Sequence, residues 1–223
     1  MNEALFFFHI PLIVAFLLAA NRFGKEMLIA FFAISAMLAN IFVTKQITMF
    51  HANVTCTDAF AVSCILSLNL LQETYGKAAA RKAVWIAFFL LLYLAVMSQI
   101  HLLYQPNNFD QTQASFQKIF RITPRLFAAS AVVAFIVQQI DIQIFGLLKK
   151  KFPSLFFFRI GGSFFITQWI DTVLFTFLGL YGIVANLWSI VLISFLIKLA
   201  AFALMSPFLS LARRLQKFQG EPQ

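Results

Sequence analysis

Residues 161–182 read GGSFFITQWIDTVLFTFLGLYG, and this stretch decides the fold class. Its length and its Phe, Ile, Leu and Val residues match a helix that crosses a bilayer, which needs about 20 mainly apolar residues. Asp171 nevertheless lies near its centre, one turn after Gln168, and Lys198 lies at a similar depth in the next apolar run. A charged group at the bilayer centre costs about 2.5–3.5 kcal/mol on insertion scales. Such groups therefore predict a function, typically the binding of something that crosses the membrane.

The composition of the whole chain points to the same class. Of the 223 residues, 61% are hydrophobic, only 11% are charged, and thirty are Phe. A soluble fold of this size has no interior large enough for so many apolar side chains. We therefore predict an all-α integral membrane protein whose residues 1–223 form a single transmembrane domain.

Seven apolar stretches are long enough to span a bilayer. They predict a bundle of about seven transmembrane helices, six plus an extra one at the N-terminus. The first stretch follows Glu3 and no basic residue, which favours a helix over a signal peptide. The last six form two units of three helices that enter the membrane from opposite sides, a possible inverted repeat. The expected spans are residues 4–20, 27–49, 57–74, 83–104, 125–148, 160–182 and 187–209.

The basic residues predict the orientation of this bundle. Most Lys and Arg fall in one set of loops, and the opposite set holds only Lys118, Arg121 and Arg125. The positive-inside rule places the richer set in the cytoplasm, with the N-terminus outside and the C-terminus inside. This bias and the lipid headgroups explain the net charge of +9 without a nucleic-acid partner. The richer set comprises Arg22, Lys25, Lys77, Arg81, Lys82, Lys149, Lys150, Lys151, Arg159, Arg213, Arg214 and Lys217.

Residues 105–124 form the one long external connection in this topology. Phe109, Phe116, Ile119 and Phe120 predict a short amphipathic helix on the outer membrane surface. That helix either covers an entrance or is a linker that rests on the membrane.

Gln168 and Asp171 are the strongest candidates for a binding site. They lie at i and i+3, on one face of the sixth span near the midplane, where secondary transporters place their substrates. A carboxylate and a carboxamide can bind the donor and acceptor edge of a flat heterocycle. The structural alternative is a salt bridge from Asp171 to Lys198 or Arg125.

Asn69 and Glu73 share one face at the inner end of the third span, because they lie at i and i+4. Glu73 either lines the site or forms an ion pair with the basic residues that follow it, Lys77, Arg81 and Lys82. Gln139 and Asp141 lie in the inner half of the fifth span. They either serve the site or hydrogen-bond neighbouring helices.

Three polar residues mark the other end of the same bundle. Asn40 and Lys45 belong to the expected second span, and Asp58 opens the third. Asp58, with Thr57, either contributes to the site or caps its helix.

Motifs of enzymes and of ATP hydrolysis are absent from the sequence. Gly76 and Lys77 lack the earlier glycine and the following Ser or Thr of a phosphate-binding loop. There is no HExxH or CxxC motif and no evident pairing of a Ser nucleophile with a His base. We therefore expect neither catalysis nor a bound metal or cofactor.

Short motifs along nearly the whole chain resemble the queuosine precursor transporter family, once grouped as vitamin uptake transporters. Their order and spacing make the resemblance specific. The matching residues are Ala39-Asn40-Ile41 with Lys45, Tyr75-Gly76-Lys77 leading to residues 80–86 (ARKAVWI), Pro124-Arg125, Gln139 with Asp141, residues 149–154 (KKKFPS), and Gln168 with Ile170-Asp171-Thr172.

The resemblance implies import of a deazaguanine base, either queuine or its cyano or aminomethyl precursor, for tRNA modification. There are two alternatives to import by this chain alone. One is a capture subunit that needs a separate ATPase module, and the other is a membrane scaffold that transports nothing. We predict that the residues that bind the substrate are Asn40, Asn69, Arg125, Gln139, Gln168 and Asp171. The predicted supporting or coupling residues are Lys45, Asp58, Glu73, Asp141 and Lys198.

This chain also departs from the family pattern at three places. Ser67-Leu68-Asn69 stands where many members have Ala-Thr-Asp, and Asp58 stands where many have Asn. Gly161-Gly162-Ser163 replaces an Asn-rich start of the sixth span. A carboxylate is thus shifted from one end of the third span to the other, which bears on which precursor is carried.

Overall fold

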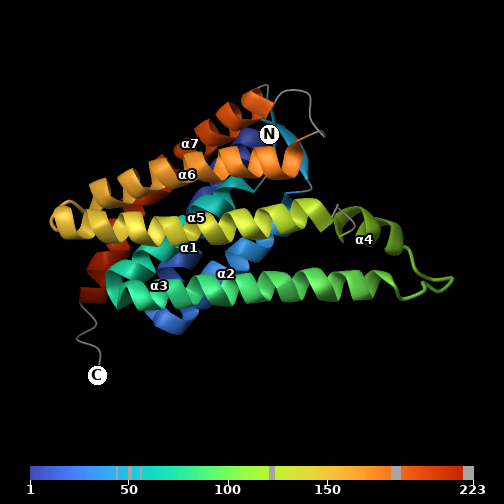
Figure 1. Ribbon diagram of the computed structural model, residues 1–223, viewed down its shortest axis with the longest axis horizontal. Helices are drawn as coiled ribbons and strands as arrows, with labels where there is room; N and C mark the ends of the chain where they lie inside the picture. Colours follow the sequence, from blue (N-terminus) through green and yellow to red (C-terminus); the bar gives the residue numbers. More distant parts are fainter. Residues whose placement is uncertain (44, 50–51, 56, 121–123, 182–186, 218–223) are drawn as a thin grey trace.

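The computed structural model describes residues 1–43, 45–49, 52–55, 57–120, 124–181 and 187–217 (Figure 1). It consists of seven helices and one small hairpin over these residues. The helices are α1 (Asn2–Phe23), α2 (Lys25–Phe42), α3 (Asp58–Leu102), α4 (Gln113–Phe120), α5 (Pro124–Lys151), α6 (Phe156–Leu180) and α7 (Leu187–Lys217). The strands are β1 (Gln46–Met49) and β2 (Ala52–Thr55).

The helices have the properties of membrane-spanning segments. Within the described residues, five are long and apolar enough to cross a bilayer, namely α1, α2, α3, α5 and α7. Large apolar side chains such as Phe16, Phe89 and Phe165 are exposed on the outside of the bundle. Since lipid tails solvate such side chains and water does not, the prediction of an all-α membrane bundle is confirmed.

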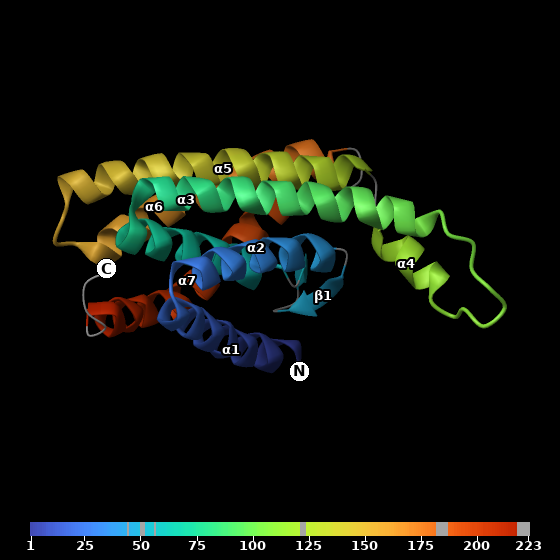
Figure 2. The same ribbon diagram turned by 90° about the horizontal axis from the view of Figure 1, so that it is seen from below.

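The 45-residue helix α3 is two helical segments that fold back on each other at Gly76. Gln72 hydrogen-bonds the carbonyl of Ile142, whereas Trp85, after the break, contacts Phe135 farther out on the same helix α5. Figure 2 shows both segments running in opposite directions from one end of the bundle. The backbone at Gly76 has φ 84° and ψ 173°, a conformation that glycine adopts without steric cost.

This break refines the prediction of two separate spans at residues 57–74 and 83–104. The turn takes a single residue, so Lys77, Arg81 and Lys82 lie in the first turns of the second segment rather than in a loop. With its two segments counted separately, α3 gives two spans beside α1, α2, α5 and α7. Helix α6 is not among the five helices named above, so the expected span at residues 160–182 stays a prediction. The inverted repeat stays a prediction.

The expected second span, residues 27–49, was too long. Helix α2 ends at Phe42, and β1 pairs antiparallel with β2, with Gln46 opposite Thr55 and Met49 opposite Ala52. The alternation of apolar Ile47 and Met49 around Thr48 is the period of a strand rather than a helix. Met49 is buried against Ile197 of α7, so the hairpin packs onto the bundle.

The first segment of α3 is the centre of the bundle. Every residue from Val62 to Gln72 is buried. Helix α2 packs along α3, α5 packs along α6, and α3 also contacts α5 and α7. Polar side chains on this segment therefore face protein on all sides.

The connections gather at two opposite ends of the bundle. The α1–α2 connection, the fold-back of α3, the α5–α6 connection and the end of α7 lie towards the left of Figure 2. The hairpin, the N-terminus and α4 lie towards the other end. The loops that the sequence analysis grouped by their positive charge thus share one end of the molecule.

The expected short helix in residues 105–124 is present as α4. Gln99 Nε2, near the end of α3, donates a hydrogen bond to the carbonyl of Phe120 at 2.8 Å, and the ring of Phe116 contacts that of His101. These contacts hold α4 against the end of α3. Its position on the membrane surface stays a prediction.

Candidate functional site

Buried polar side chains of α3, α5 and α6 meet inside the bundle, and we refer to them as the central polar layer. Gln72 Nε2 donates to the carbonyl of Ile142 at 3.0 Å, which fixes the level of α3 against α5. Asp141 contacts Ser163 and Thr167, which fixes the level of α5 against α6. The layer comprises Asn69, Gln72, Gln138, Asp141, Ser163, Thr167 and Gln168.

Asn69 is the most unusual member of this layer. Its side chain is 0% exposed, and neither Oδ1 nor Nδ2 has a hydrogen-bond partner among the described residues. Gln168 is also buried, and its Oε1 likewise lacks a partner there. A buried unpaired polar group costs about 1–3 kcal/mol, and native structures contain few of them. The two amides therefore keep unused hydrogen-bonding capacity inside the bundle.

Asp171 makes the ion pair that the sequence analysis gave as its structural alternative. Lys198 Nζ lies 2.6 Å from Asp171 Oδ2 and also donates to Thr172 Oγ1 at 3.1 Å. The pair joins α6 to α7, as the similar depth of the two residues in the sequence predicted. It does not exclude a role in binding, because the Asp171 side chain remains 21% exposed.

Asp58 lies near this pair at the start of α3. Its Oδ1 accepts a hydrogen bond from Ser194 of α7 at 3.1 Å. The positive charge of Lys198 attracts both carboxylates, that of Asp58 and that of Asp171. Thr57, the residue before the helix, makes no side-chain capping hydrogen bond. Asp58 thus joins α3 to α7, which a residue that only caps its own helix would not do.

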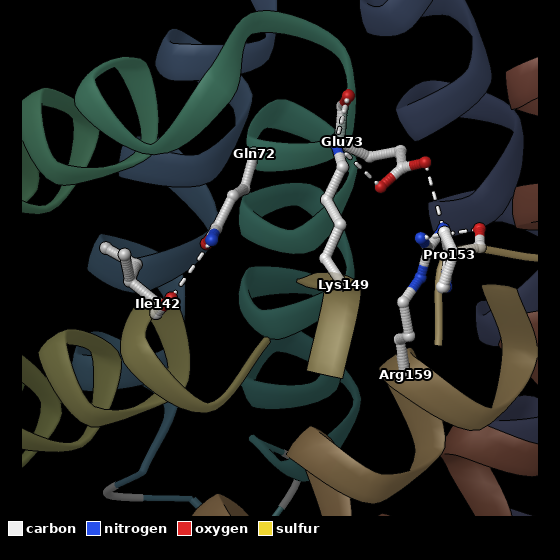
Figure 3. A network of polar contacts seen from close by, with 6 residues as sticks. All are labelled: Gln72, Glu73, Ile142, Lys149, Pro153 and Arg159. Carbon is white, nitrogen blue, oxygen red and sulfur yellow. Dashed lines mark hydrogen bonds and ion pairs between the residues drawn. The ribbon is translucent and has the colours of Figure 1, made fainter. Parts of the chain in front are cut away.

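Glu73 anchors a second network at the end where the basic loops gather (Figure 3). Its carboxylate pairs with Arg159 at 2.9 Å and with Lys149 at 3.1 Å. Arg159 also donates to the carbonyl of Pro153 at 3.0 Å. The network ties the end of the first α3 segment to the end of α5 and the start of α6.

The sequence analysis expected an ion pair as one reading of Glu73, but it named the wrong partners. Lys149 and Arg159 are distant in sequence, whereas Lys77 donates a hydrogen bond to Gln143. Arg159 was assigned to a cytoplasmic loop, yet it belongs to α6 and is 1% exposed. Its guanidinium lies over the rings of Phe145 and Phe156, which cover it from lipid and water.

The remaining predicted residues do not belong to the central polar layer as defined above. Asn40, near the end of α2, donates to the carbonyl of Ala36 and accepts a hydrogen bond from Ser130 of α5. Gln139 is half-buried on α5. Lys45 is exposed beyond the end of α2, so its expected place within a span was wrong. The side chain of Arg125 lies outside the described part of the structure.

Sequence reasoning missed several residues that complete these networks. Ser163 and Thr167 are hydroxyl donors to Asp141, and Arg159 is the cation for Glu73. One sequence signal could have found Arg159, since a carboxylate near a membrane core requires a cation within reach. The small hydroxyl residues gave no such signal, because Ser and Thr occur throughout helix interfaces.

Apolar helices around a buried polar layer, with ion pairs on both sides of this layer, are the features of a multi-pass membrane protein. Residues 56–212 match the profile of a family described as "Putative vitamin uptake transporter". The chain belongs to this family. It is 32% identical, over 220 residues, to a protein of Bacillus subtilis (strain 168) named "Probable queuosine precursor transporter", with 96% of this chain and 95% of that protein covered. No solved structure matches the chain.

Proposed function

We propose that this chain imports a queuosine precursor across the inner membrane of a bacterium by alternating access. The name of the Bacillus subtilis relative and the match over nearly the full length support this class of solute. The observation that carries the proposal is a pair of buried amides. Among the described residues, both polar atoms of the Asn69 side chain and Oε1 of Gln168 lack hydrogen-bond partners. The charged loops support an orientation with the N-terminus outside and the C-terminus in the cytoplasm.

The chemistry of the two amides fits a deazaguanine edge. Such a base presents a ring N–H, an amino group and a carbonyl on one side. Asn69 offers both a donor and an acceptor, and Gln168 offers an acceptor. In this proposal these two residues read the base, while Asp171 is held by Lys198 at the outer side of the layer.

The other predicted residues have places around this site. Gln139 and Asn40 lie on α5 and α2, and the contact of Asn40 with Ser130 joins these two helices. Both would shape the path of the base rather than bind its edge. Arg125 remains a proposed binding residue through its position at the start of α5.

The Glu73 network would serve as the inner closure of the transport cycle. It joins three elements at the end that we place in the cytoplasm, and the side chains of Glu73 and Arg159 are almost completely buried. Opening of the site to the cytoplasm would then require Arg159 to separate from Glu73. Alternating access in small transporters commonly involves such rocking of helix groups about a midplane site.

Ligand-induced stabilisation of the purified protein in detergent tests this function. We expect queuine or one of its precursors to raise Tm, since a ligand at 100 times its Kd stabilises by about 2.7 kcal/mol. Guanine serves as the related control base. Absence of a shift with all of these bases, from protein shown to be folded, would contradict the proposal and favour another solute or a scaffold role.

Reconstitution separates import by this chain alone from the capture-subunit alternative. The purified chain in liposomes should take up the base without ATP or another protein. Ligand binding without any uptake would indicate that a separate ATPase module completes the transporter.

A further inference from the structure

Asp141 is a buried carboxylate that the proposed binding of the base does not use. It lies on α5 and is 0% exposed. Glu73 pairs with Arg159 and Lys149, and Asp171 pairs with Lys198. Asp58 is attracted by the same lysine. In the part of the chain that the structure describes, Asp141 has no ion pair, so its charge lacks a protein counter-charge.

The two oxygens of Asp141 have different surroundings. Oδ1 accepts a hydrogen bond from the Ser163 hydroxyl and a longer one, at 3.4 Å, from the Thr167 hydroxyl. Oδ2 is buried and has no hydrogen-bond partner among the described residues. Two donors thus orient the carboxyl group through one oxygen and leave the other available.

An ionised carboxylate in this position is unfavourable, because burial removes its hydration and the two hydroxyls at Oδ1 replace only part of it. A bound cation or a proton relieves this cost. Hard metal ions such as Ca²⁺ take about 6–8 oxygen ligands, whereas the side chains that contact Asp141 are two hydroxyls. A proton on Oδ2 needs only the one free oxygen.

We propose that Asp141 is the site of a coupling proton that drives import. This inference rests on the proposed function. A proton from outside forms an O–H bond with Oδ2, which makes the carboxyl group neutral. When the inner end opens, the O–H bond breaks and the proton passes to cytoplasmic water. One proton then crosses the membrane with each molecule of the base.

The polar groups around Asp141 are neutral and do not exchange protons near neutral pH, so the carboxyl group of Asp141 is the proton-exchanging group of this layer. From α6 they are the neutral Ser163 and Thr167, and the polar residues of α3 at this depth, Asn69 and Gln72, are also neutral. Charged groups lie beyond the layer on either side. They are Glu73, Arg159 and Lys149 towards the basic end, and Asp171, Lys198 and Asp58 towards the other.

Infrared spectroscopy of the purified protein tests the protonation directly, whether or not the base is transported. We expect the carbonyl-stretch band of a protonated carboxylic acid at neutral pH in the unmodified protein, and its loss in Asp141→Asn. The matched control is Asp110→Asn. Hydrogen bonds from Thr112 hold the pKa of Asp110 below its usual value, so this exposed carboxylate stays ionised and its removal leaves the band unchanged.

Ser163→Ala keeps the experiment informative if Asp141→Asn fails to fold. This variant retains the carboxyl group but removes its main hydrogen-bond donor, so the band should remain and shift in frequency. Absence of the band in the unmodified protein, or a band that both Asp141→Asn and Ser163→Ala leave unchanged, would overturn the proposal.

Transport in liposomes tests the coupling. An acidic exterior should drive accumulation of the labelled base in the unmodified protein and in Asp110→Asn, and a protonophore should abolish it. Asp141→Asn should lose this accumulation. Exchange of labelled for unlabelled base that ignores the pH gradient, or accumulation that needs a sodium gradient, would overturn the proton site while leaving the proposed function intact. Absence of exchange would count against the proposed function. The infrared band would then still show whether Asp141 is protonated.

Discussion

Arg159 Nη2 lies 2.9 Å from Glu73 Oε1, and this contact connects the start of α6 to the end of the first α3 segment. The side chains are 1% and 7% exposed, so both charges are removed from water. Lys149 adds a second cation from the end of α5. Breaking one partner of a buried pair leaves an uncompensated charge, which is more costly than the pair itself is favourable.

Arg159→Met should therefore destabilise the protein by about 3–5 kcal/mol. The free energy of unfolding in detergent measures this effect. Arg22→Met, at an exposed position in the last turn of α1, is the matched control and should change stability little. Adding Glu73→Gln to Arg159→Met should restore part of the loss, because the second change removes a buried carboxylate whose one remaining ion-pair partner is the part-exposed Lys149. Equal losses of unfolding free energy in Arg159→Met and Arg22→Met would show that the Glu73 network does not stabilise the fold.

Gly76→Ala tests the fold-back of α3. An added Cβ would meet no atom within 4 Å, so the expected cost comes from the backbone conformation alone. A non-glycine residue with positive φ loses about 1–2 kcal/mol. Gly161→Ala, whose Cβ would make an ordinary contact with Phe202 at 3.9 Å inside helix α6, should be neutral or slightly stabilising. A stable Gly76→Ala variant would contradict the turn at this residue.

Asn69→Leu should separate stability from binding. Leucine has a similar size and removes both unpaired polar atoms from a fully buried position. We expect a rise in Tm of the ligand-free protein, since an unsatisfied buried group costs about 1–3 kcal/mol. The same variant should lose the shift caused by the base. Loss of stability together with retained binding would show that Asn69 serves the packing of the bundle.

Asp171→Asn should reduce uptake of the base by about tenfold or more. The substitution keeps the shape but removes the charge that pairs with Lys198, and a charge-assisted hydrogen bond contributes about 1.5–3 kcal/mol. Initial uptake rates at matched amounts of inserted protein measure the effect. Asp110→Asn, in the exposed loop before α4, is the control. Unchanged uptake by Asp171→Asn would remove this residue from the site.

Hydropathy predicted the spans well where a helix is long and continuous, as in α5, whose expected bounds of 125–148 lie within Pro124–Lys151. It could not predict the hairpin after Phe42, because apolar strands and buried helices have similar mean hydropathy over short runs. Hydropathy also predicted a connection between the spans at residues 57–74 and 83–104, but it could not predict that Gly76 alone makes the turn. Its physical reason is the positive φ that the structure reveals.

The sequence predicts an ion pair of the candidate site where the two charged residues lie at the same depth in neighbouring spans. Asp171 and Lys198 fall at similar depths of adjacent helices, and the structure pairs them. The partners of Glu73 and Asp141 depend instead on which helices are neighbours, and the sequence gives no contact between α3, α5 and α6. Arg159 was misplaced because positive charge near a span end was read as a loop signal.

Uptake by the purified chain in liposomes tests the central claim most directly. Labelled queuine, or one of its cyano and aminomethyl precursors, is offered to vesicles preloaded with the unlabelled base, without ATP. The account predicts rapid, saturable exchange that excess deazaguanine inhibits and that Asp171→Asn greatly slows. Exchange no faster than in protein-free vesicles, from chain shown to be folded and inserted, would contradict it.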